Sequence, residues 1–142
     1  MRMKRWHALV LALIAVALTA YGVRHILENR AEQKREIAYQ SALRPYSERF
    51  RPGTTRKEVE EYLRARNIGF RQMCCVDYKS HKSVWDDLTK ISQEGAPWFC
   101  SENNVYVAFE FTGPKRNGVE WSADPSDALK AISIYHWLEG CL

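Results

Sequence analysis

An uninterrupted apolar run near the start is the longest pattern in the chain. Residues 8–23, from Ala8 to Val23, carry no charge, and Thr19 is the only polar side chain among them. A basic tail, residues 1–7, precedes the run, and Trp6 and Tyr21 bracket it, as aromatic residues do at membrane interfaces. The run is slightly shorter than the roughly 20 residues of a spanning helix, but long flanking side chains can extend it. The pattern predicts an uncleaved transmembrane or signal-anchor helix.

The competing interpretation of this run is a cleaved signal peptide. Ala15-Val16-Ala17 fits the small-x-small rule for cleavage, although it would leave a very short apolar region. Lys and Arg are nearly balanced on the two sides of the run, so the positive-inside rule does not decide the orientation. The short basic leader favours a single-pass protein of the bacterial inner membrane, with its domain in the periplasm.

Two helical patterns follow the apolar run. Residues 24–50 contain no glycine and few apolar positions, which predicts a helical stalk that ends at Pro45. Beyond the Pro52-Gly53 turn, Thr55 and Glu58 form a capping box, and Val59, Tyr62 and Leu63 share one face. This second pattern predicts a helix over residues 56–67, with Gly69 as the residue that ends it.

Strand patterns fill most of the rest of the chain. We expect strands over residues 70–76, 84–91, 104–111 and 129–138, of which 104–111 alternates most clearly. One face of this strand carries Val105, Val107, Phe109 and Phe111, and the other carries Tyr106, Ala108 and Glu110. We expect Glu110 to be exposed to solvent. Residues 51–142 are therefore predicted to form a small α+β domain, in which one helix packs on a three- to four-stranded antiparallel sheet.

Charge is divided unevenly between the two halves of the chain. Residues 24–71 hold 12 Lys and Arg against 7 Asp and Glu, whereas residues 72–142 hold 6 against 10. A basic half next to a membrane favours contact with anionic lipid head groups. No basic and aromatic stretch resembles a nucleic-acid motif, so we expect no nucleic-acid partner.

Four cysteines, Cys74, Cys75, Cys100 and Cys141, are disulfide candidates, since periplasmic thiols tend to be oxidised. A bond between the neighbours Cys74 and Cys75 would strain the backbone. Two pairings then remain open: Cys74–Cys100 with Cys75–Cys141, or Cys74–Cys141 with Cys75–Cys100. The alternatives to disulfides are a zinc site, a thiol-redox site or free thiols in a cytosol-facing domain, but the C-x-x-C spacing of such sites is absent.

The sequence contains none of the common catalytic signatures, so we predict no enzyme, no metal and no cofactor. Glu102 and Glu110 are conceivable paired carboxylates, and the pair Asp86-Asp87 most resembles a solvated turn. Trp98, Phe99 and Trp121 form a candidate interaction patch if they are exposed.

The segment "PGTTRKEVEEYL" resembles the helix start of the small periplasmic domain of the SmpA/OmlA family, through Gly53, Thr55, Glu58, Val59 and Leu63. Those proteins are lipoproteins of the outer-membrane β-barrel assembly machinery, and their domain packs a helical pair on a three-stranded sheet. This chain lacks their lipidated cysteine and the Leu-Gly-x-Pro that follows the helix, and its cysteine set looks like that of an uncharacterised bacterial membrane-anchored group. The resemblance implies an envelope scaffold or binding domain with an unknown protein partner. We therefore expect a membrane-anchored, non-enzymatic binding or assembly module, with a small thiol-redox or metal-binding protein as the alternative.

Overall fold

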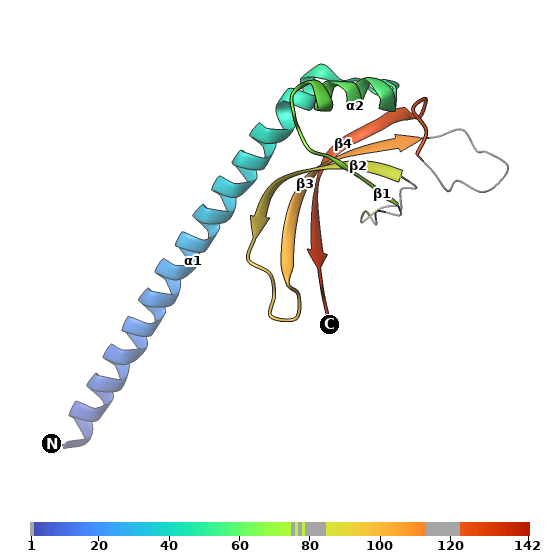
Figure 1. Cartoon of the computed structure of the whole chain (residues 1–142). Coiled ribbons are helices and arrows are strands. Elements are labelled where there is room, and N and C mark those ends of the chain that lie inside the picture. The colour runs from blue at the N-terminus through green and yellow to red at the C-terminus, as the bar shows by residue number, and fades with distance from the viewer. Residues whose placement is uncertain (1, 75, 77, 79–84, 113–122) are drawn as a thin grey trace. The chain divides into compact units, whose positions relative to one another are not determined.

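The computed structural model describes the backbone of residues 2–74, 76, 78, 85–112 and 123–142, and the side chains from Ala12 onward. Its element order is α1 (Arg2–Arg49), α2 (Arg56–Ala65), β1 (Arg71–Cys74), β2 (Trp85–Glu94), β3 (Glu102–Thr112) and β4 (Ala128–Glu139) (Figure 1). The four strands form one antiparallel sheet in the order β1-β2-β3-β4. The α+β class and the antiparallel sheet are as predicted.

The chain divides into two compact units, one up to Ala38 and one from Tyr39 to Leu142. The first unit is a single stretch of helix whose apolar side chains from Leu13 to Val23 are exposed. Wherever side chains are described, α1 holds no stretch long and apolar enough to cross a membrane. A helical stretch that starts at Ala12 and is long enough to span a membrane includes the charged residues Arg24 and Glu28. Residues 8–11 of the predicted span lie outside the described side chains. The transmembrane helix predicted over residues 8–23 is thus not supported by the described part of the chain.

The last turns of α1 belong to the core of the second unit. We predicted that the helix ends at Pro45, but it continues to Arg49 with Pro45 inside it. The reason lies beyond the proline, where Tyr46 and Phe50 are buried against Phe109 of the sheet. Burial of two aromatic side chains outweighs the hydrogen bond that a proline removes from a helix.

Helix α2 begins with the predicted capping box. Thr55 accepts a hydrogen bond from the backbone N–H of Glu58, and the Glu58 side chain accepts one from the N–H of Thr55. The helix ends at Ala65, and Asn67 adopts the left-handed conformation (φ 55°) that we assigned to Gly69. Asn tolerates this conformation because its short polar side chain can bond locally. Val59 and Leu63 are fully buried, as their spacing predicted.

The alternation of β3 separates the two faces of the sheet as predicted. Val107, Phe109 and Phe111 lie in the core beneath α2 and the end of α1, together with Leu129 of β4. On the other face Tyr106 and Ala108 pack with Leu88 and Val76. The expectation for Glu110 was wrong, because it is buried beside Lys130 of β4 rather than solvated.

A buried guanidinium joins α2 to the sheet. Arg56, the first residue of α2, is 1% exposed and donates to Asp87 Oδ1 at 2.6 Å. It also donates to the backbone carbonyl of Trp85 at 2.8 Å and to Asp127 Oδ2 at 3.3 Å. Its guanidinium carbon lies 4.0 Å from the centre of the Phe111 ring. One side chain therefore connects the helix, β2, β3 and the segment before β4.

We expect Arg56→Leu to lower the free energy of unfolding by about 3–5 kcal/mol, because it leaves Asp87 and Asp127 buried without their cation. Urea denaturation of the variant and the wild type measures this difference. The matched control is Lys57→Leu, since Lys57 is the next residue and its pair with Glu61 is exposed. That control should shift stability by less than about 0.5 kcal/mol. Equal losses in the two variants would contradict the proposed role of Arg56.

Candidate functional site: an aromatic corner beside a disulfide

The connection between β2 and β3 presents two aromatic side chains to solvent. Cys100 donates its backbone N–H to the carbonyl of Pro97 at 2.9 Å, which closes a tight turn with Trp98 and Phe99 at its centre. Trp98 is 91% exposed and Phe99 is 41% exposed, and their rings meet edge to face at 5.8 Å. Side chains at the centre of a turn point away from the strands it joins, so the sheet does not cover these rings.

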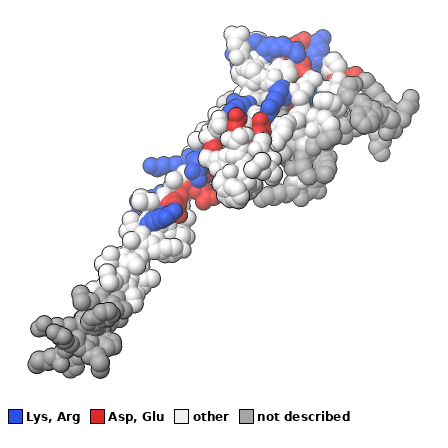
Figure 2. Space-filling model, turned by 60° about the horizontal axis from the view of Figure 1, so that its bottom comes forward, with Lys and Arg blue, Asp and Glu red and all other residues white. Residues whose placement is uncertain are grey.

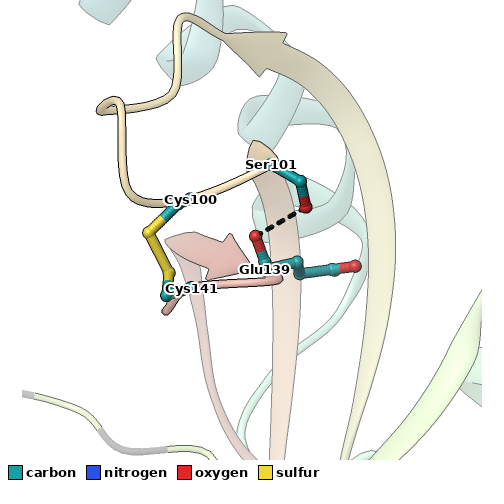
Figure 3. Close-up of a disulfide and its surroundings, with 4 residues drawn as sticks. All are labelled: Cys100, Ser101, Glu139 and Cys141. Atoms are coloured by element: carbon teal, nitrogen blue, oxygen red, sulfur yellow. Dashed lines mark hydrogen bonds between the residues drawn. A yellow bond between two sulfur atoms is a disulfide. The ribbon is translucent and has the colours of Figure 1, made fainter.

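A disulfide ties this turn to the end of the chain. Cys100 and Cys141 are bonded, with the sulfur atoms 2.00 Å apart (Figure 3). The bond follows from the register of β3 and β4, in which Glu102 lies opposite Glu139. Continuing that register by two residues brings Cys100 opposite Cys141. The chain connects β3 to β4 at one end of the pair, between Thr112 and Ala128. The disulfide closes the opposite end.

Hydrogen bonds and a glycine fix the corner around the disulfide. The Ser101 hydroxyl donates to the carbonyl of Glu139 at 2.9 Å (Figure 3). The Leu142 N–H donates to the carbonyl of Phe99 at 2.8 Å. Gly140 has φ +61°, and a Cβ there would lie 2.2 Å from Ser101 Oγ. Glycine is favoured here, because a larger residue would have to displace the Ser101 side chain and adopt the left-handed conformation. We call Trp98, Phe99 and the fully exposed Leu142 the aromatic corner.

The observed disulfide corrects both predicted pairings. We had paired Cys100 with Cys74 or Cys75, whereas it is bonded to Cys141. Cys74 is itself disulfide-bonded, and neither Cys100 nor Cys141 can be its partner. Cys75 lies outside the described residues. The error came from assigning cysteines by the alternation of one strand, since the register of β3 with β4 decides which residues meet.

Two residues of the predicted interaction patch are exposed, and the patch itself stays a prediction. Trp98 and Phe99 are exposed and adjacent, as the patch requires, while Trp121 lies outside the described residues. Leu142 was missed. A register that placed Cys100 opposite Cys141 would have brought Leu142 to the turn, but that register cannot be read from the sequence.

The candidate carboxylates are placed differently from our expectations. Glu102 and Glu110 lie eight residues apart on β3, which is about 27 Å along a strand, so they form no pair. Glu110 instead lies opposite Asp86 of β2, and both are buried. The Tyr78 hydroxyl donates to Asp86 at 2.6 Å, and Lys130 pairs with Glu110. Burial and this hydrogen bond raise the pKa of Tyr78.

The expected solvated turn at Asp86-Asp87 is a buried part of β2, with one carboxylate on each face of the sheet. Burial raises the pKa of Asp87 to about 7, although the Arg56 guanidinium acts in the opposite direction. Both carboxylates are held by partners inside the domain, which is the arrangement of structural acids. Among the described residues, no group of three or more His, Cys, Asp and Glu could hold a metal ion.

Acidic side chains lie next to the aromatic corner. Glu102 and Glu139 face each other at the ends of β3 and β4. Arg71 of β1 pairs with Glu139 and lies over the rings of Tyr106 and Trp137 at 4.8 and 4.7 Å, and its hydrogen bond lowers the pKa of Glu139. The corner thus combines exposed apolar surface with a polar, partly acidic border, which is the composition of a protein-contact surface.

Comparison of the chain with models of protein families, with curated proteins and with solved structures found no match.

We expect Cys100→Ser, Cys141→Ser and the double variant to lose the same free energy of unfolding, about 4 kcal/mol, because each breaks one bond that closes a loop of 41 residues. Urea denaturation of the three variants under oxidising conditions provides the test. If the two cysteines belonged to separate bonds, the double variant would lose about the sum of the single losses, and the observed pairing would be contradicted.

Proposed function

We propose that this chain is a membrane-anchored, non-enzymatic binding module that docks a protein partner through the aromatic corner. The observation that carries the proposal is the exposure of Trp98 on a turn held by a disulfide. Burial of an indole is among the largest single contributions that a side chain makes to binding. Because the turn is fixed to β4 through Cys100–Cys141, little conformational entropy is lost when a partner covers it.

The surroundings of the corner favour a partner of definite chemistry. Glu102 accepts a hydrogen bond from the Asn104 amide at 2.7 Å, which holds its carboxylate at the border of the corner. The complementary surface is an apolar pocket that receives the indole, with Lys or Arg at its rim. A lipid surface is a poorer match, since a carboxylate beside the inserted ring disfavours anionic head groups.

Support for the anchor comes from the first unit of the chain. Leu13, Ile14, Val16 and Leu18 are each at least half exposed, and at 100° per residue they point in different directions around the helix. In Figure 2 the helix surface next to the grey residues is white, and blue and red side chains follow it farther along the helix. An apolar surface on all sides is suited to lipid, whereas a single protein partner would cover one stripe. We propose that residues 8–23 anchor the chain in the bacterial inner membrane.

The disulfide supports placing the domain in the periplasm, because such bonds persist in oxidising compartments. The resemblance to the SmpA/OmlA helix start remains a prediction. Its positions have structural roles here, since Thr55 and Glu58 cap α2 while Val59 and Leu63 fill the core. Those roles explain why these residues begin a helix that packs on the sheet.

We expect the wild-type chain to remain in the membrane fraction after alkaline extraction. Introducing Leu13→Lys together with Val16→Lys should release most of it, because each charge at the centre of a span costs about 2.5–3.5 kcal/mol. The control is Ile26→Lys, which adds charge to an exposed position beyond Arg24 and should leave the chain in the membrane. Release of the wild-type chain, or equal retention of all variants, would contradict the anchor.

For the corner, we expect a photo-reactive p-benzoylphenylalanine in place of Trp98 to form one protein adduct of defined mass when intact cells are irradiated. Glu102→Lys in the same chain should reduce the adduct severalfold, because it places a cation against the basic rim of the partner. Denaturing electrophoresis and mass spectrometry measure the yield.

The control places the same photo-reactive residue at Gln93, an exposed position of β2, where no adduct of that mass should form. Adducts with lipid alone would favour a membrane-contacting corner and overturn the protein partner. An adduct unaffected by Glu102→Lys would overturn the basic rim.

A further inference from the structure

The outer edge of β4 is a second surface, independent of the aromatic corner. Strand β4 pairs along its inner side with β3 and is the last strand of the sheet (Figure 1). On its outer side the start is covered, where Leu129 exchanges hydrogen bonds with Gly53 and Thr54, and Ala128 bridges to Thr55. Among the described residues, no strand pairs with the outer side of β4 beyond Leu129.

This edge lacks the features that usually protect an edge strand. Residues 131–138, with the sequence AISIYHWL, contain no proline, no glycine and no Lys, Arg, Asp or Glu. The register shift of β4 lies opposite Glu110 and Phe111, so the strand is regular from Ile132 to Glu139. The nearest charges, Lys130 and Glu139, pair with Glu110 and Arg71 of the same sheet. A regular, uncharged stretch of eight residues, about 27 Å long, is a template for another strand.

The disulfide keeps the chain end away from this edge. Cys141 is bonded to Cys100, and Leu142 donates its N–H to the carbonyl of Phe99. Both contacts hold the last residues on the side of β3. Cys141 and Leu142 are therefore held at the Phe99–Cys100 turn, although they follow β4 directly.

We propose that β4 pairs in antiparallel orientation with β4 of a second copy of this chain, joining two sheets into one. Two-fold symmetry makes the same edge serve both partners, so one unprotected strand is sufficient. The orientation is set by charge, since antiparallel pairing brings Lys130 of one copy toward Glu139 of the other, twice per dimer. A parallel arrangement would place like charges together. Lys130 and Glu139 retain exposed side-chain surface, 46% and 30%, for this contact.

Self-pairing also covers apolar side chains that the domain leaves half-exposed. Ile132 and Ile134 lie on the core side of β4 and are only partly buried, and Leu138 on the same side is 41% exposed. In an antiparallel pair, opposite residues share a face, so these side chains would meet their counterparts from the second copy. The added contact extends the existing core across the junction.

The test uses the full chain in detergent and measures its mass by sedimentation, with the detergent contribution subtracted. We expect two chains per particle for the wild type and one for His136→Lys with Leu138→Lys, because charges on an edge strand oppose pairing. The matched control, Ser47→Lys with Ala65→Lys, adds two lysines at exposed helix positions and should remain dimeric. A wild-type chain that stays monomeric up to its solubility limit would overturn the proposal. A dimer that survives the β4 variant would also overturn it, since the contact would then lie elsewhere, for example on α1.

Hydrogen exchange of the wild-type dimer gives a readout that needs no variant. Every second backbone amide between Ala131 and Leu138 should be protected in the dimer, because alternate N–H groups of an edge strand point outward. Fast exchange of those amides in a dimeric sample would exclude β4 as the interface. Neither measurement depends on the partner of the aromatic corner, so the two proposals can fail separately.

Discussion

The domain depends on a single buried cation. Arg56 begins α2, and its guanidinium binds carboxylates that come from β2 and from the segment before β4. Its stacking on Phe111 adds β3 to the same contact. Removing a guanidinium from water is costly, and only this complete set of partners compensates for it. These contacts favour the position of α2 on the sheet in which Arg56 reaches all of these partners.

The register between β3 and β4 determines the surface that we propose as the binding site. Because Glu102 lies opposite Glu139, the two cysteines just beyond the strands meet and the last residue reaches the Trp98-Phe99 turn. The same bond that presents the aromatic corner also holds Cys141 and Leu142 at the turn. One register thus accounts for the aromatic corner at the end of the sheet and for β4 as its last described strand.

Three acidic side chains of the domain are buried in the sheet instead of lying at its surface. Asp86, Asp87 and Glu110 are acids that a sequence reader would place in water, yet each is buried in the sheet with a partner. Tyr78, Arg56 and Lys130 supply those partners from other parts of the chain. Their carboxylates are held inside the domain by these partners and contribute to the fold.

Local patterns in the sequence determined the elements: the capping box fixed the start of α2, and the alternation of Val107 and Phe109 fixed the faces of β3. Exposure of Trp98 and Phe99 was also within reach, because a proline-led turn next to a strand presents its central residues. The pairing of Cys100 with Cys141, the burial of Arg56 with Asp87 and the continuation of α1 past Pro45 were decided by the tertiary structure. These three features have one physical cause. Each depends on which residues far apart in the sequence come into contact, and the free energy of those contacts outweighs the local preferences of the residues involved.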